Sequence, residues 1–234
     1  MIQILPQAQL GDTMQETIQE KRYYARNLPH WQPEDGVFFI TGRLDGSLPI
    51  SVILQLQALR DAKIDEIRKN EPQFSDMEVQ NAIKAEKELY FGKFDDLLDN
   101  PTSGPVFLAQ KPIAQLLANT FQKGFEKEYF KLVCFTIMSN HFHAILCQIK
   151  RPLFRITQSI KSTTGIDSNR ILERTNGEKF WQRETYDRLI RDEKEFIQKM
   201  HYTLNNPVKV GLVKNWRDWE FNYLNPEFEE YAPE

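Results

Sequence analysis

The chain has 234 residues, a length that fits one domain with an insertion. It is 41% hydrophobic and 12% aromatic, which suffices for a packed core, and its mean hydropathy of −0.55 excludes a membrane protein. Two cysteines, Cys134 and Cys147, exclude a disulfide-rich secreted domain and a cysteine-type zinc module. Because the first residues also lack the pattern of a signal peptide, we expect a soluble, cytoplasmic protein.

The formal net charge is −3, but the charge is unevenly distributed. Residues 150–218 hold 15 Lys and Arg against 9 Asp and Glu, so the remainder of the chain is acidic. A local basic stretch is what matters for contact with phosphate, because salt screens charges over about 10 Å. An ordinary mixed-charge surface and a nucleic-acid interface are both compatible with this pattern.

The first half of the chain predicts one strand and several helical segments. Residues 1–27 are polar and are expected to form an N-terminal arm. Residues 37–44 are rich in β-formers and lie between two Asp-Gly pairs, which predicts a strand. Leu48-Pro49 is expected to open a long helical segment with apolar residues at helical spacing, and a helical insertion is expected over about residues 60–100. A further helix is expected over residues 112–125.

The second half predicts a β-hairpin followed by alternating helix and strand. The hairpin consists of residues 129–138 and 141–148, joined by Ser139-Asn140. It is followed by a helix over 153–172, a strand over 180–190 and a last helix from Asp192 that Asn206-Pro207 is expected to end. This order predicts an α+β fold with an antiparallel sheet and helices packed mainly on one of its faces.

Two of the four histidines, His141 and His143, are neighbours on the predicted hairpin. Side chains at positions i and i+2 of a strand share a face, so both imidazoles project together while Phe142 points to the core. Two adjacent imidazoles on a polar, open sheet face suit a divalent metal. An ordinary half-exposed pair of histidines is the alternative interpretation.

The last predicted helix carries one aromatic residue on its polar side. Phe196, Met200 and Leu204 fall on one apolar stripe, whereas Tyr202 lies on the other side of the helix. Asn206 follows at i+4 and is therefore a neighbour of Tyr202. A phenol beside an amide, together with two imidazoles, is a set of groups suited to phosphoryl transfer with Tyr202 as nucleophile.

These motifs together resemble those of single-tyrosine HUH transposases, in particular the REP-associated branch. Residues 138–143 (MSNHFH) are similar to the family's M-P-N-H-x-H signature, with Ser139 in place of proline. Residues 180–193 resemble the block before the tyrosine helix, and residues 202–213 resemble that helix and its exit. The resemblance covers about residues 27–222, and the acidic insertion is longer than is typical of the family.

The resemblance implies a ferredoxin-like, RRM-like antiparallel sheet of the HUH nuclease fold, with a catalytic domain over residues 28–222 and a tail over residues 223–234. It further implies an enzyme that cuts and rejoins single-stranded DNA near hairpins through a 5′-phosphotyrosine at Tyr202. His141, His143 and Asn206 would hold Mg²⁺ or Mn²⁺. Family members of this branch are usually monomers, so a monomer is expected, with a dimer as the alternative.

Basic residues of the second half are candidates for contact with the DNA backbone. They are Lys150, Arg151, Arg155, Lys161, Arg170, Arg183, Arg188 and Arg191. Two other functions remain compatible with the sequence: a domesticated relative that binds structured DNA or RNA without cutting it, and a metal-dependent hydrolase in which water is the nucleophile.

Overall fold

The computed structural model describes residues 23–25, 29–31, 36–69, 75–175 and 177–234. The predicted N-terminal arm over residues 1–27 lies outside these ranges except for β1 (Tyr23–Ala25), which pairs antiparallel with β2 (Pro29–Trp31). Among the helices in the described ranges, none combines the length and the hydrophobicity needed to cross a bilayer.

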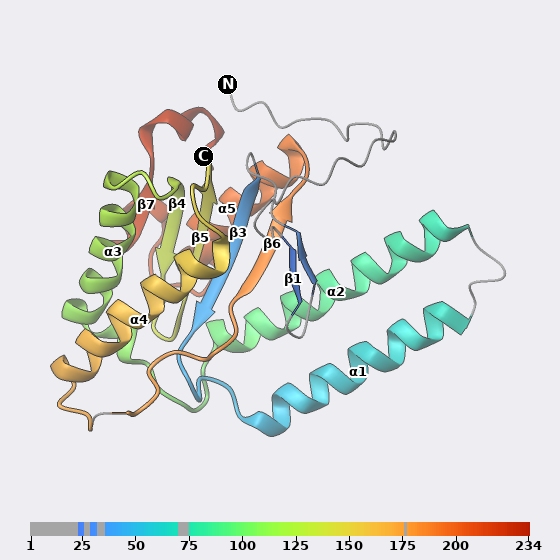
Figure 1. Ribbon diagram of the computed structural model, residues 1–234, viewed down its shortest axis with the longest axis horizontal. Coiled ribbons are helices and arrows are strands. Elements are labelled where there is room, and N and C mark those ends of the chain that lie inside the picture. Colours follow the sequence, from blue (N-terminus) through green and yellow to red (C-terminus); the bar gives the residue numbers. More distant parts are fainter. Residues whose placement is uncertain (1–22, 26–28, 32–35, 70–74, 176) are drawn as a thin grey trace.

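A five-stranded antiparallel sheet forms the centre of the molecule (Figure 1). Its strands are β3 (Val37–Arg43), β4 (Lys131–Ile137), β5 (His141–Cys147), β6 (Tyr186–Ile190) and β7 (Asn222–Leu224), and their order across the sheet is β6-β3-β5-β4-β7. The helices α3 (Lys111–Glu126) and α4 (Leu153–Ile171) connect β3 to β4 and β5 to β6. The predicted α+β fold with a ferredoxin-like strand order is thereby confirmed.

Helices cover both faces of this sheet. Because side chains alternate along a strand, Phe38 and Ile40 of β3 pack beneath α3 and α4, whereas Val37 and Phe39 face the other way. That second face is covered by α5 (Glu193–Lys209) and by the end of α2 (Asp76–Asp99). The sequence pattern had placed helices mainly on the first face, and it contained no signal that α2 would return to the sheet.

The insertion is a pair of helices that extends away from the sheet (Figure 1). Helix α1 (Ile50–Lys69) begins directly after Leu48-Pro49, as expected, so the insertion that it forms with α2 starts before residue 60. Helix α2 starts with a capping box in which the hydroxyl of Ser75 accepts from the Glu78 backbone and the Glu78 carboxylate accepts from the Ser75 backbone. Buried residues of the two helices form a small core of their own.

Two predicted boundaries were wrong, both for tertiary reasons. The strand over 180–190 is limited to β6, because residue 181 makes only an isolated bridge to Leu44. Helix α5 does not end at Asn206-Pro207 but continues to Lys209 with Pro207 buried in its last turn. A proline there removes one backbone hydrogen-bond donor. The free energy lost with that hydrogen bond is smaller than the free energy that would be lost if the last turn no longer packed against the sheet.

The residues expected to form a C-terminal tail pack against the sheet. Strand β7 pairs with β4, and a 3-10 turn over Pro226–Tyr231 buries Phe228 against Phe196 of α5. The C-terminal residues therefore contribute to holding α5 in place.

Gly42 of β3 lies directly opposite Phe142 of β5, and a Cβ atom at Gly42 would come within 2.3 Å of the Phe142 ring. We expect Gly42→Ala to lower the free energy of unfolding by about 1–3 kcal/mol, because a packed core relaxes poorly around an added methyl group. Gly92→Ala is the matched control, since a Cβ there meets no atom within 4 Å and the helix gains about 0.5–1 kcal/mol. Urea denaturation of both variants measures the difference, and an equal effect at both positions would contradict this account of the packing.

Candidate functional site

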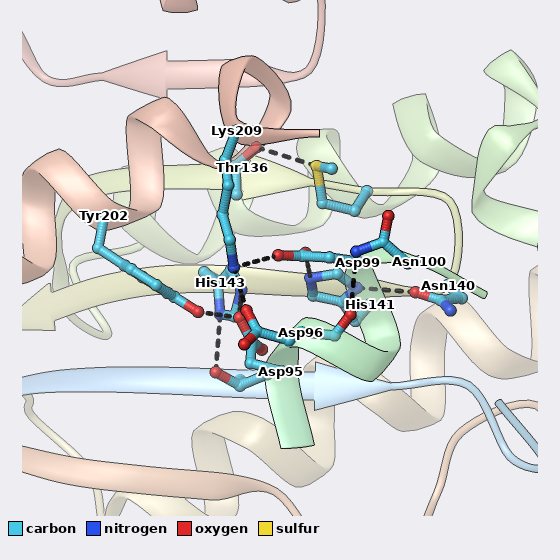
Figure 2. A network of polar contacts seen from close by, with 12 residues as sticks. Asp95, Asp96, Asp99, Asn100, Thr136, Asn140, His141, His143, Tyr202 and Lys209 are labelled. Carbon is cyan, nitrogen blue, oxygen red and sulfur yellow. Dashed lines mark hydrogen bonds and ion pairs between the residues drawn. The ribbon is translucent and has the colours of Figure 1, made fainter. Parts of the chain in front are cut away.

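His141 and His143 lie side by side on β5, with ring centres 4.8 Å apart, on the face opposite Phe142. Both side chains are 0% exposed. The expectation that they occupy an open sheet face was wrong, because α5 and the end of α2 cover this part of the sheet (Figure 2). The pair therefore forms a buried site and not a surface one.

The Nδ1 atom of each imidazole is held by a neighbour. Nδ1 of His141 is 2.7 Å from the side-chain oxygen of Asn140, which can only accept, so this Nδ1 carries the proton. Nδ1 of His143 is 2.8 Å from the Thr41 hydroxyl on β3. A hydrogen bond at Nδ1 orients the imidazole ring and directs the lone pair of Nε2 toward a metal.

Helix α2 brings two carboxylates to these imidazoles. Asp95 lies 3.3 Å from Nε2 of His143, and Asp99 lies 3.5 Å from Nε2 of His141 (Figure 2). Neither residue was predicted, because the local pattern of the insertion does not show which element its helices pack against. Their i, i+4 spacing, which places them on one helix face, was the available signal.

Several buried polar atoms of this cluster lack a hydrogen-bond partner among the described residues. They are Nε2 of His141, Nε2 of His143, one carboxylate oxygen each of Asp95 and Asp99, and both amide atoms of Asn206. A buried polar group without a partner is costly, so a concentration of such atoms is unusual in a folded protein. A cation among these atoms would satisfy the imidazole and carboxylate groups together.

The geometry fits a divalent metal held by Asp95, His141 and His143. One ligand atom from each lies within 4.8 Å of the others. Two ligands bound to one ion at roughly 2.1 Å, at right or tetrahedral angles, lie about 3.0–3.4 Å apart, so the most distant pair must approach by about 1.5 Å to hold an ion. Burial lowers the pKa of His141 to about 3, which keeps this imidazole in the neutral form that binds metals.

Tyr202 of α5 points into the same cluster and is half-buried. Its ring centre lies 5.4 Å from that of His143, and its hydroxyl donates a hydrogen bond to Asp95. The sequence placed Tyr202 on the polar side of its helix, away from the apolar stripe. The structure agrees with that placement, and it adds that α2 covers this side, with Phe91 packed beside Tyr202.

Two lysines of α5 supply positive charge at the site. The ammonium of Lys209 lies 2.8 Å from Asp99 and also contacts Asp96. Burial by itself lowers the pKa of Lys209, but its hydrogen bonds to these two carboxylates raise the pKa above the ordinary value. The ammonium of Lys199 lies over the Tyr202 ring, 5.4 Å from its centre, and burial lowers the pKa of this group.

Asn206, the third predicted ligand, is 1% exposed on the same helix. Its amide lacks a hydrogen-bond partner among the described residues, like the imidazole Nε2 atoms. This state is compatible with a ligand role, which stays a prediction.

The predicted DNA contacts are distributed over two faces. Lys161 and Arg183 line a groove of about 630 Å³ between α4 and residues 177–185, on the side of the sheet opposite to His141 and His143. Lys161 donates to the backbone carbonyls of residues 183 and 184, which anchors that segment. Other basic residues expected to contact DNA on the α4 side are exposed: Lys150, Arg151, Arg155 and Arg170.

Arg188 and Arg191 lie near the other side of the sheet. Arg188 bonds to Glu195 of α5 and to Glu88 of α2, at 2.6 Å from Glu88, so it has a structural role in joining α2 to the sheet. The side chain of Arg191 is exposed. The set of basic residues therefore does not form one continuous surface.

Comparison with known proteins supports the similarity that the motifs indicate. A Haemophilus influenzae protein provisionally named a REP-associated tyrosine transposase is 28% identical over 104 residues, which cover 40% of this chain and 58% of the relative. A solved structure of a REP-associated tyrosine transposase bound to a REP hairpin aligns with 85% of this chain and 80% of its own, at 16% identity and a TM-score of 0.48. No protein-family model matches the chain. The chain is thus similar to REP-associated tyrosine transposases, and it spans less than two thirds of the relative.

Manganese is expected to stabilise the wild-type protein against heat. A ligand at 100 times its Kd contributes about 2.7 kcal/mol, which corresponds to a rise in Tm of roughly 5–10 °C for a chain of this size. The double variant His141→Ala/His143→Ala should show no rise. His201→Ala is the matched control, because His201 bonds to the Tyr231 carbonyl. An equal Mn²⁺ effect in the double variant, measured by calorimetry, would exclude these imidazoles as ligands.

Proposed function

We propose that this protein is a tyrosine transposase of the REP-associated kind, an endonuclease and strand transferase that acts on single-stranded or hairpin-bearing DNA. The observation that carries the proposal is the convergence of the Tyr202 phenol with His141 and His143 in one buried cluster. The similarity to the Haemophilus influenzae relative supports it. The protein is proposed to act as a monomer.

The proposed reaction is a transesterification. The phenol oxygen of Tyr202 attacks a backbone phosphorus, a Tyr–O–P bond forms, and the bond from phosphorus to the 3′ oxygen breaks. The DNA 5′ end stays on Tyr202 as a phosphotyrosine, and the phenol proton is balanced by the proton gained at the released 3′-OH. Because one phosphodiester replaces another, the reverse attack by a 3′-OH rejoins strands without an energy source.

The proposed metal ligands are His141, His143 and Asn206, with Asp95 as a carboxylate of the same cluster. A bound Mg²⁺ or Mn²⁺ supplies Lewis-acid stabilisation of charge on the phosphate. The mixed nitrogen and oxygen donors favour Mn²⁺ over the oxygen-preferring Mg²⁺. A phenol with an ordinary pKa near 10 is a weak nucleophile at neutral pH, so Tyr202 depends on this polar environment.

We also propose that exposed basic residues contact the DNA backbone. Arg151 and Arg155 lie at the start of α4, where their guanidinium groups stack on Tyr129 and Phe154 at 3.8 and 4.9 Å from the ring centres. Lys150 and Arg170 on the same side, with Lys161 and Arg183 at the groove, extend this set. Arg191 would act on the side of Tyr202, whereas the predicted contact by Arg188 is replaced by its ion pairs with Glu88 and Glu195.

Tyr202→Phe should abolish cleavage of a hairpin-bearing single strand and the covalent protein–DNA adduct that survives boiling in SDS. DNA affinity should stay nearly unchanged, because the cationic side chains remain. The free energy of unfolding should fall by about 1–3 kcal/mol, since Asp95 loses the donor that Tyr202 supplies. Gel electrophoresis and thermal unfolding measure these effects.

The matched control for this variant is Tyr223→Phe, because Tyr223 packs on Phe135 of β4 within the core cluster on the other face of the sheet. Tyr186→Phe is a second control, closer to the site, since Tyr186 stacks on Phe91. An adduct formed by Tyr202→Phe would identify a different nucleophile. Cleavage by the wild type without any adduct would favour a water-dependent hydrolase, and binding without cleavage would favour a DNA- or RNA-binding relative.

Binding of single-stranded or hairpin DNA should weaken steeply with salt, because each neutralised phosphate of a single strand contributes a slope of about −0.7 in log K against log salt. Arg155→Ala should reduce that slope by roughly one phosphate contact. Lys63→Ala is the control, since Lys63 pairs with Glu66 on α1. Fluorescence anisotropy at several salt concentrations provides the measurement. Efficient cutting of fully paired duplex, or equal slopes for all three proteins, would contradict the proposed DNA contacts.

A further inference from the structure

The end of α2 occupies the place that a DNA phosphate needs. Asp95 accepts the hydrogen bond of the Tyr202 hydroxyl and lies 3.3 Å from Nε2 of His143. Asp99 lies 3.5 Å from Nε2 of His141 and is held by Lys209 (Figure 2). Carboxylates of one helix therefore bind the proposed nucleophile and lie directly against both imidazoles.

This arrangement is incompatible with DNA at the site. His141, His143 and Asp95 are 0% exposed, so no polymer can reach Nε2 of either histidine while α2 stays in place. A carboxylate and a phosphodiester both present anionic oxygens, so they compete for the same lysine and metal. The Asp95 carboxylate beside the Tyr202 hydroxyl would also repel a phosphate.

We propose that the α1–α2 pair is an autoinhibitory lid, in which Asp95 and Asp99 take the place of the scissile phosphate until the pair moves aside. This inference rests on the proposed function, since it concerns access of single-stranded DNA to Tyr202. The lid releases the imidazoles, the phenol and Lys209 together, because all of them are bound by the same end of α2.

The α1–α2 pair is built as a separate unit. Ile64, Val79 and Ile83 give it a core of its own, apart from the two cores of the sheet. Besides the contacts of Asp95, Asp96 and Asp99, it is attached to the sheet side by Phe91, which stacks on Tyr186 with ring centres 4.1 Å apart, and by the ion pair of Glu88 with Arg188 at 2.6 Å. These contacts are localised, so weakening them frees the lid without unfolding the sheet.

The two chain segments that lead into and out of the pair lie against each other. A Cβ atom at Gly104 would come within 2.5 Å of the Gly46 carbonyl oxygen. Gly46 and Gly104 have φ values of +74° and +89°, a backbone region that glycine enters without strain. Adjacent glycine-containing connections allow both ends of the pair to rotate about one place, as a hinge requires.

Phe91→Ala in the full-length protein tests the lid by weakening its attachment. The rate of covalent adduct formation with a hairpin-bearing single strand in Mn²⁺ should rise on the order of tenfold, because a larger fraction of molecules is open. Modification of His141 and His143 by diethyl pyrocarbonate, read by mass spectrometry without DNA or metal, should rise in parallel. Ile83→Ala is the matched control, since it loosens the pair internally without touching the sheet.

A second variant, Glu88→Gln, keeps the shape of α2 and removes the ion pair that attaches it to Arg188. This variant should also raise the rate of adduct formation. It replaces Phe91→Ala as the test if Phe91→Ala lowers the Tm so far that the protein is unfolded. A fall in the adduct rate in this variant, or an unchanged rate in a folded Phe91→Ala, would show that α2 is a permanent wall of the site and overturn the lid.

These outcomes are separable from failure of the proposed function. If the wild type and every variant fail to form an adduct, the transposase proposal fails. Whether the α1–α2 pair acts as a lid is then decided by histidine modification alone. Greater modification in Phe91→Ala than in Ile83→Ala supports it, and equal modification overturns it.

Discussion

The architecture of this protein depends on keeping a group of polar and ionisable side chains out of water. Two imidazoles and two carboxylates lie between the sheet and two helices, and His141, His143 and Asp95 have no solvent exposure. Burial of such groups is costly unless each finds an opposite charge, a hydrogen bond or a metal. Lys209, Asn140 and Thr41 meet part of this need, and the remaining unpaired atoms are what make the cluster a candidate metal site.

The alternation of side chains along the central strands separates two functions of the sheet. One face packs α3 and α4 into the larger apolar core, which provides a rigid support. The other face holds the histidines beneath α5, so that Tyr202 and the imidazoles are positioned by two regular elements joined through a common core. The insertion also covers part of this second face, where Phe91 of α2 joins the core. The two ends of the insertion lie against each other at Gly46 and Gly104.

The sequence motifs alone indicated much of the site. The spacing of His141 and His143 predicted that both share a face, and the helical pattern placed Tyr202 away from the apolar stripe; the structure shows both features. Asp95 and Asp99 were not predicted, because they are distant in sequence from the hairpin and local patterns carry no information on which helix packs over a strand. The extension of α5 beyond Pro207 escaped prediction because tertiary packing outweighed a local helix-breaking signal.

The sequence by itself determined the α+β class, the positions of the main helices and strands, and the residue types available for chemistry. These properties follow from periodicity, turn residues and motif spacing, which act over a few neighbouring positions. Only the tertiary structure decided that the histidine face is covered and that acidic residues of the insertion meet the imidazoles and Tyr202. Burial and electrostatic contact depend on elements far apart in the chain, so they are set by how helices pack on the sheet and not by any local pattern.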